Sequence, residues 1–319
     1  MAYTCRFCGF HGEIDEFEVD YTNNRGFWCP DCDGFSYFDP KFNNQRFLLL
    51  LESNEPTSNL PKLSRKFPSR VSPLRYPGGK SKIINQIYNK CNKDKLKNFV
   101  EPFAGGASVG LSLLLSHQVE ELYLNDADYG IYSLFWSIKF FSEVLCDRII
   151  AFKPSNLAQK ASKKVITDNY TSMDLIDAGW TCLINNRLSF SGIWKANCMS
   201  NPSARWNPEE LCRRIRNIHA VSEHIHLSCT DALPYIEEMY WLPDATIFID
   251  PPYFAKGKEL YHHYYSPSDH KALAELIDDL YKGMPGADII VTYDMSEYIK
   301  SIYDYPEVEL LPRKYSIAN

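Results

Sequence analysis

The chain has 319 residues, 45% of them apolar and 23% charged, and a formal net charge of −6. This composition is ordinary for a globular protein, and the length suggests one large domain or two smaller ones with a self-sufficient core. No apolar run approaches the roughly 18–20 residues that span a bilayer, and the first dozen residues, with cysteines and charges, are unlike a signal peptide. We therefore expect a cytoplasmic protein without a membrane contact.

The charge is distributed unevenly along the chain. Residues 41–97 contain thirteen Lys and Arg against three acids, and residues 153–216 contain ten against five. A negative net charge does not indicate a nucleic-acid-binding protein, but local basic faces on an acidic protein can bind phosphates. Solvated linker and helix surfaces would give the same pattern, so charge alone leaves both interpretations open.

Four of the ten cysteines form two Cys-x-x-Cys pairs near the amino terminus. Two such pairs about twenty residues apart are typical of a closed, structural zinc site with four thiolate ligands. A disulfide pair fits poorly with a chain that lacks an export signal, and a redox pair fits poorly with a motif that occurs twice in so small a module. We therefore predict a structural Zn²⁺ bound by Cys5, Cys8, Cys29 and Cys32.

Residues 1–48 are predicted to form a small β-rich zinc ribbon, because aromatic residues around position 36 favour short strands. Residues 49–73 are predicted to be a linker, since Pro, Ser and Asn are frequent from residue 52 onward. The six other cysteines have no ligand spacing and are interpreted as small buried apolar residues.

From residue 98 onward, strand-like apolar runs alternate with helical patterns. Strands are expected at 99–101, 121–125, 225–229, 246–249 and 288–292, and helices at 107–117, 130–144, 232–240 and 269–282. This alternation predicts an α/β fold with a doubly wound, mostly parallel sheet covered by helices on both faces. Ligands of such sheets bind at the carboxyl ends of the strands.

Acids or glycines follow four of these predicted strands. Glu101 precedes a pair of glycines beginning at Gly105, where the backbone can approach a ligand at a helix N-terminus. Asp126 follows the next strand, where an acid can accept hydrogen bonds from ribose hydroxyls. Asp231 and Asp250 follow the third and fourth. Asp126 and Asp231 could each be helix N-caps instead, but the four strand ends together predict one cofactor crevice beside a reaction centre.

Four stretches carry a family resemblance: Leu74-Arg-Tyr-Pro-Gly-Gly-Lys80, Phe99-Val-Glu-Pro-Phe-Ala-Gly-Gly106, Leu124-Asn-Asp126 and Asp250-Pro-Pro-Tyr253. In this order they closely resemble the motifs of Dam-like (alpha-group) DNA adenine-N6 methyltransferases, which use S-adenosylmethionine. The resemblance implies the S-adenosylmethionine methyltransferase fold, with a catalytic domain at residues 74–149 and 221–319. It also implies a helical target-recognition insert at residues 150–220.

The resemblance implies roles for individual residues in binding S-adenosylmethionine. Tyr76 and Lys80 would lie near its methionine part, Asp126 would bind its ribose, and Asp231 would lie near its adenine. The full set of expected cofactor-binding residues is Tyr76, Gly79, Lys80, Glu101, Phe103, Gly105, Asp126, Asp231 and Asp250.

The insert is expected to contact double-stranded DNA. Residues 186–195 resemble the family's segment before the recognition hairpin, and the basic balance of the insert agrees with phosphate contacts. The expected DNA-binding residues are Arg187, Lys195 and Arg205. A solvated helix face is an equally open interpretation of Arg213, Arg214 and Arg216. The zinc ribbon is an addition to the family pattern, interpreted as an accessory DNA contact or, alternatively, a protein contact.

The resemblance places the reaction at Asp250, Pro251, Pro252 and Tyr253. An adenine would be flipped out of DNA so that its N6 amine becomes accessible. The Asp250 carboxylate and a carbonyl fixed by the prolines would accept both amine N–H bonds and stabilise the developing positive charge. Tyr253 would stack on the base. No strong general base is needed, because the proton leaves after methyl transfer.

The three histidines that follow, His262, His263 and His270, are therefore interpreted as noncatalytic, with the first two in a loop over the site. The family usually continues into another strand beyond the point where this chain stops.

Other functions are open at this level. The same chemistry could methylate RNA adenine or the N4 amine of cytosine, and a vestigial cofactor fold would leave a non-catalytic zinc-ribbon DNA-binding protein. Intact residues at every expected site position favour the enzyme. The resemblance also allows a cognate restriction endonuclease as partner, in a bacterial or phage-infected cell, and a monomer or a dimer.

Overall fold

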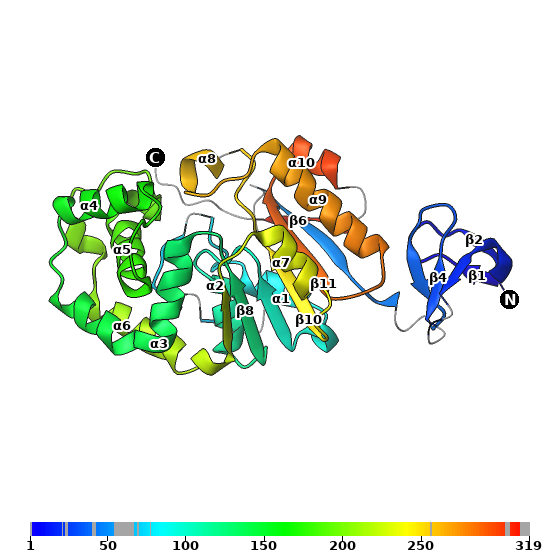
Figure 1. Ribbon diagram of the computed structural model, residues 1–319, viewed down its shortest axis with the longest axis horizontal. Coiled ribbons are helices and arrows are strands. Elements are labelled where there is room, and N and C mark those ends of the chain that lie inside the picture. Colours follow the sequence, from blue (N-terminus) through cyan, green and yellow to red (C-terminus); the bar gives the residue numbers. More distant parts are fainter. Residues whose placement is uncertain are drawn as a thin grey trace.

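The computed structural model describes residues 2–20, 22, 25–39, 43–53, 67–68, 70–76, 78–255, 257–303 and 307–312. They form a small amino-terminal module, a central sheet with helices on both faces, and a helical lobe at the opposite end from the module (Figure 1). Residues 54–66, which make up most of the expected linker, and residues 313–319, where the chain stops, lie outside the described ranges.

The amino-terminal module consists of two small antiparallel sheets. β1 (Ala2–Thr4) pairs with β2 (His11–Glu13), and β4 (Gly26–Trp28) lies between β3 (Glu18–Asp20) and β5 (Phe35–Tyr37). Phe17, Phe27 and Phe35 form its buried apolar core. A module of this size has too little core to be stable alone, so small natural domains of this kind are commonly held by a metal.

The central sheet has seven strands in the order β12-β6-β11-β10-β7-β8-β9, and every neighbouring pair is parallel. Its strands are β6 (Phe47–Ser53), β7 (Asn98–Glu101), β8 (Glu121–Asn125), β9 (Ile225–Ser228), β10 (Ala245–Ile249), β11 (Asp288–Asp294) and β12 (Glu307–Pro312). The predicted α/β fold with a parallel sheet is confirmed. All five predicted strands are present, and β6 and β12 extend the sheet beyond them.

Strand β6 corrects the prediction that residues 49–53 belong to a linker. These residues lie between β11 and β12 with all of their side chains buried, and Leu50 is in register with Thr292 of β11 and Glu309 of β12. The burial of both faces explains the unbroken apolar run from Phe47 to Leu51. Because β6 is parallel to the other strands, its last residues lie at the same edge of the sheet as theirs.

The two faces of the sheet are covered by different helices. In β6, Leu48 and Leu50 belong to the core under α1 (Ile84–Lys90), α2 (Ser108–Leu114) and α3 (Tyr129–Ala151). Leu49 and Leu51 belong to the opposite core. That core lies under α7 (Ala232–Met239), α9 (Pro267–Lys282) and α10 (Glu297–Ile302). This alternation is the period-two pattern of a strand that is buried on both faces.

The helical lobe consists of α4 (Asn156–Thr167), α5 (Leu175–Leu188) and α6 (Pro208–His219), with α5 and α6 packed on α3 (Figure 1). Its buried side chains, including Leu183, Leu211 and Ile215, join the core on the face of the sheet that α1, α2 and α3 cover. A short helix, α8 (Gly257–Leu260), follows β10 and precedes α9. Among the described helices, none is both long and apolar enough to cross a membrane.

Arg6 fixes the amino-terminal module to the sheet. Its guanidinium donates to the carbonyl oxygens of Phe35 in the module (3.1 Å) and Tyr281 in α9 (3.1 Å), and the ring of Phe7 packs edge-on against Tyr281 (5.1 Å). Arg6 also donates to the Gln45 side chain (3.4 Å), two residues before β6 begins. The module therefore sits at the amino end of β6, away from the carboxyl ends of the strands. The contact of this module with DNA or, alternatively, with a protein stays a prediction.

Candidate active site and metal centre

A cleft of about 1710 Å³ lies at the carboxyl ends of the strands, between the sheet and the helical lobe. Thirteen of the expected catalytic, cofactor-binding and DNA-binding residues line this cleft: Tyr76, Gly79, Lys80, Glu101, Phe103, Gly105, Asp126, Arg187, Arg205, Asp231, Asp250, Pro252 and Tyr253. Pro251 and Lys195 are not among its lining residues. One cavity therefore brings together residues that are spread over most of the chain.

The turn after β7 is shaped by backbone geometry that needs glycine. Gly105 has a φ of +48°, and a Cβ atom there would come within 2.8 Å of the Tyr76 ring. Its N–H donates to Asp126 Oδ2 at 2.7 Å. Glu101 is buried and accepts a hydrogen bond from the Gly110 N–H (2.8 Å). Burial raises the pKa of Glu101 to about 8.

Asp126 follows β8 and is held by the backbone on two sides. Besides Gly105, the N–H of Asp128 donates to it, at 2.9 Å. Burial, and next the negative charge of Asp128, raise the pKa of Asp126 to about 7. The alternative of Asp126 as a helix N-cap is wrong, because Asp128 caps α3 by accepting from the Gly130 N–H. Asp231 does cap α7, accepting from the Leu233 N–H at 2.9 Å, and is exposed to the cleft.

A buried ammonium group lies at the floor of the cleft. Lys80 is 2% exposed, forms an ion pair with Asp250, and its Nζ lies 3.2 Å from Glu52 Oε1. Thr292 of β11 donates to Asp250 Oδ1 at 2.8 Å. Burial raises the pKa of Asp250 above its ordinary value, while the Lys80 charge opposes that rise. Three strands, β6, β10 and β11, thus contribute to one charged cluster.

Tyr253 is tied to the same cluster. Its hydroxyl donates to Glu52 Oε2 at 3.1 Å, and its ring lies edge-on to Tyr261 with centroids 6.4 Å apart. Tyr261 in turn stacks on Tyr76, at 5.5 Å. Sequence reasoning missed Glu52, although a signal was present: the run Phe47-Leu-Leu-Leu-Leu-Glu52 ends in an acid, as the run before Asp250 does.

The basic residues of the lobe differ in their availability for DNA. Arg187 is buried and donates to the carbonyl oxygens of Arg205 (2.6 Å) and Pro73 (3.4 Å), and burial lowers its pKa to about 10. It therefore orders the segment around Arg205, and its direct contact with DNA stays a prediction. Arg205 and Lys195 are exposed, and Lys195 lies 5.0 Å from the centre of the Trp194 ring.

The arginines of α6 mostly form surface ion pairs, as the helix-face interpretation expects. Arg213 pairs with Glu210 and Arg216 with Glu143, and all four side chains are at least about one-third exposed. Arg214 is more buried, lines the cleft and donates to the Ser72 carbonyl at 2.9 Å.

The three histidines have separate environments. His270 is fully buried, its Nδ1 lies 2.9 Å from the Tyr293 hydroxyl, and burial lowers its pKa to about 4. It is therefore neutral at physiological pH and does not line the cleft. His262 and His263 do line the cleft, in the segment between α8 and α9.

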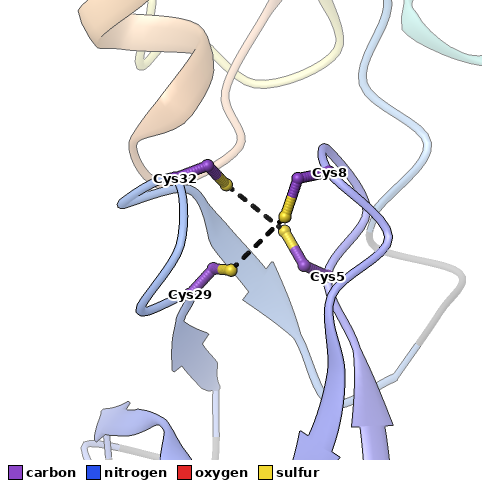
Figure 2. Close-up of side chains that lie close together, drawn as sticks. All are labelled: Cys5, Cys8, Cys29 and Cys32. Carbon is purple, nitrogen blue, oxygen red and sulfur yellow. Dashed lines mark hydrogen bonds between the residues drawn. The ribbon is translucent and has the colours of Figure 1, made fainter.

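The four predicted zinc ligands meet in the amino-terminal module. The sulfur atoms of Cys5, Cys8, Cys29 and Cys32 all lie within 4.8 Å of one another and converge on one point (Figure 2). Cys5 and Cys32 are 3.6 Å apart at sulfur, as are Cys8 and Cys29. Tetrahedral zinc with Zn–S bonds of about 2.3 Å separates its sulfurs by about 3.8 Å. The other six cysteines, all in described parts of the chain, join no such group.

Comparison with known proteins agrees with this geometry. The family model described as D12 class N6 adenine-specific DNA methyltransferase matches residues 76–317. The chain is also similar to the type II methyltransferase M.MjaIII of Methanocaldococcus jannaschii, with 21% identity over 198 residues. That match covers 56% of this chain and 68% of the relative.

Gly105→Ala tests the glycine turn beside Tyr76. We expect affinity for S-adenosylmethionine to fall at least about tenfold, because the left-handed backbone costs alanine about 1–2 kcal/mol and its methyl group displaces the Tyr76 ring. Isothermal titration measures the affinity. Gly257→Ala is the matched control, because its nearest contact would be 3.5 Å away. Unchanged affinity in Gly105→Ala would show that the turn does not form the cofactor pocket.

Proposed function

Because the chain belongs to the D12 class of N6 adenine-specific DNA methyltransferases, we propose that its cleft methylates the exocyclic amine of an adenine flipped out of double-stranded DNA. The observation that carries this proposal is the position of Asp250 at the carboxyl end of β10, inside the cleft and paired with Lys80. The N6 amine lies inside the duplex, so base flipping follows from the chemistry.

The residues around the turn after β7 fit S-adenosylmethionine, the methyl donor that the family implies. The Asp126 carboxylate suits the ribose hydroxyls, and the glycine turn at Gly105 lets the backbone approach a ligand closely. Tyr76, Gly79, Lys80, Glu101, Phe103, Asp231 and Asp250 would complete the pocket. When bound, the cofactor supplies a methyl group on a positively charged sulfur.

Asp250 has the central role in the proposed mechanism. The amine lone pair of adenine is delocalised into the ring, which makes it a poor nucleophile. Asp250 and a backbone carbonyl near Pro251 accept the two N–H bonds, which localises the lone pair and stabilises the positive charge that develops on nitrogen. Pro251 and Pro252 restrict the backbone that presents the carbonyl. The new N–C bond would form as the donor's sulfur–methyl bond breaks with its electron pair left on sulfur, and the amine would then lose a proton to water. Tyr253 would support the flipped base.

DNA would approach the open side of the cleft. Exposed Arg205 and Lys195 are the proposed phosphate contacts, and Arg187 acts through the segment that it orders. Basic residues in such positions orient the duplex without reading its sequence. A cognate restriction endonuclease stays a predicted partner, supported by the similarity to a type II methyltransferase.

Asp250→Asn tests the reaction centre. Transfer of labelled methyl groups to DNA should fall about 10²–10³-fold, as when one preorganised electrostatic partner of a transition state is removed. Nucleoside analysis of the wild-type product should give N6-methyladenine. N4-methylcytosine, or label in RNA alone, would select one of the alternative substrates, and undiminished transfer by the variant would exclude the proposed role of Asp250.

Glu52 is a further residue that we assign to this site, as a positioning residue. It contacts both Lys80 and Tyr253, so it divides the Lys80 charge between two carboxylates and holds the Tyr253 hydroxyl. Without Glu52, Lys80 would pair with Asp250 alone and draw electron density away from the oxygen that must accept the amine N–H.

Glu52→Gln retains a hydrogen-bond acceptor for Tyr253 but removes the charge. The negative charge of Glu52 raises the pKa of Asp250, so the variant should have a lower Asp250 pKa. The acid limb of its kcat–pH profile should therefore move to lower pH, and kcat on the plateau should fall roughly tenfold. Glu275→Gln, at an exposed pair with Lys271, is the control. A lower kcat with an unchanged acid limb of the pH profile would show that Glu52 has only a structural role and does not influence the pKa of Asp250.

The four-cysteine cluster is proposed to hold structural zinc. Four thiolates fill the tetrahedral shell and leave no open position for catalysis. The metal would stabilise the module, and through Arg6 also its contact with the sheet.

Cys8→Ser, at an exposed member of the cluster, should reduce tightly bound zinc from about one atom per chain towards zero and lower the thermal midpoint. Mass-spectrometric metal analysis and calorimetry measure the two effects. Cys198→Ser is the control because Cys198 lies outside the cluster. Equal zinc contents in the two variants would contradict the assignment.

A further inference from the structure

A second group of metal-ligand side chains lies in the cleft, far from the cysteine cluster. Asp128 at the start of α3 faces His262 and His263 from the segment between α8 and α9. One candidate ligand atom from each residue lies within 4.8 Å of the others. We propose that these three residues bind a divalent transition-metal ion, such as Zn²⁺, which ties the segment 261–266 to the start of α3.

The distance between His262 and Asp128 is that of two ligands on one ion. His262 Nδ1 lies 3.6 Å from Asp128 Oδ2, which is too long for a hydrogen bond. The same nitrogen is buried and has no hydrogen-bond partner in the described structure. Zinc bonds of about 2.0–2.1 Å place two tetrahedral ligands about 3.3–3.4 Å apart. The pair therefore needs only a small adjustment to share a metal.

A direct ion pair would have a different geometry, which this protein also contains. His224 Nδ1 and His226 Nε2 lie 3.0 and 2.8 Å from the two oxygens of Glu121 on the surface. Those are ordinary hydrogen-bond distances. His262 is more buried than either and yet stays further from its acid. The longer distance between His262 and Asp128 therefore favours a metal ion between them over a direct hydrogen bond from imidazole to carboxylate.

The surroundings keep the ligands in place. Asp128 Oδ1 accepts from the Gly130 N–H at 2.8 Å as the helix cap, and Oδ2 is the oxygen that faces His262. The His262 ring packs edge-on against Trp194 (4.8 Å) and His263 (4.6 Å). Two imidazoles and one carboxylate suit zinc, cobalt or nickel better than calcium or magnesium, which prefer oxygen ligands alone. Further coordination positions would open to the cleft that all three residues line.

The site adjoins the proposed cofactor pocket. The N–H of Asp128 donates to Asp126. In segment 261–266, the ring of Tyr261 stacks on Tyr76 and the ring of Tyr265 packs edge-on against Phe103. A metal at Asp128 would add a third attachment between this segment and the pocket. We therefore expect the ion to slow the dissociation of S-adenosylmethionine; this consequence rests on the proposed function, whereas the metal site does not.

Titration of the untagged full chain carrying one equivalent of zinc with Co²⁺ tests the site, because the four-thiolate cluster takes up that zinc and leaves the Asp128, His262 and His263 group free to bind Co²⁺. The wild type should bind one additional Co²⁺, without the charge-transfer absorption of cobalt thiolates. His263→Gln, at an exposed ligand, and Asp128→Asn, which keeps a helix-capping oxygen, should each weaken this binding at least tenfold. His226→Gln, which removes an imidazole beside an acid elsewhere, should bind like the wild type.

Three results would overturn the metal site: no additional Co²⁺ in the wild type, Co²⁺ binding as tight as that of the wild type in His263→Gln and Asp128→Asn, or loss of binding in His226→Gln. Circular dichroism checks that each variant is folded. Stopped-flow release of S-adenosylmethionine, with and without the ion, tests the attachment of the segment. If Co²⁺ binds but the release rate of S-adenosylmethionine does not change, the metal site is confirmed and its effect on cofactor release is excluded.

Discussion

The architecture of the cleft depends on one buried cation. Lys80 has 2% of its surface exposed, and an ammonium group in that position is stable only with close anionic partners. Glu52 and Asp250 supply them from the ends of two strands, β6 and β10, that are not neighbours in the sheet but flank β11. The cluster therefore forms only when all three strands are parallel and in register. Assembly of this charged cluster requires the folded sheet.

The same logic explains why the strands end as they do. Strands β6 and β10 are buried on both faces, and their carboxylates lie at the end of one strand, at Glu52, and directly after the other, at Asp250. Those ends meet at one edge of the sheet. At this edge Gly105 lacks a side chain and so leaves space beside the Tyr76 ring. The apolar interiors of β6 and β10 exclude charge, which leaves Glu52 and Asp250 at this edge.

The sequence predicted the parts of this site that are encoded locally. Asp250, Asp126 and Gly105 lie within short motifs at the ends of recognisable strands, and the cysteine pairs carry their own spacing. Glu52 and β6 were missed because their partners are distant: Tyr253, which bonds Glu52, is 201 residues away. The buried state of Arg187 was also invisible, because a basic residue in a basic segment has the same sequence signal whether it binds phosphate or a backbone carbonyl.

The place of β6 in the chain also affects how the protein is made. The backbone N–H of Arg46, one residue before this strand, donates to Asp288 at the start of β11, 242 residues later, and β12 follows later still. During synthesis the run of four leucines is complete long before either neighbour exists. Pairing over such a separation is slow, and an unpaired apolar strand is prone to associate with other chains. The amino-terminal module directly precedes this strand, so a nascent chain whose module has already folded would hold one end of β6 next to ordered structure while the rest of the sheet is translated.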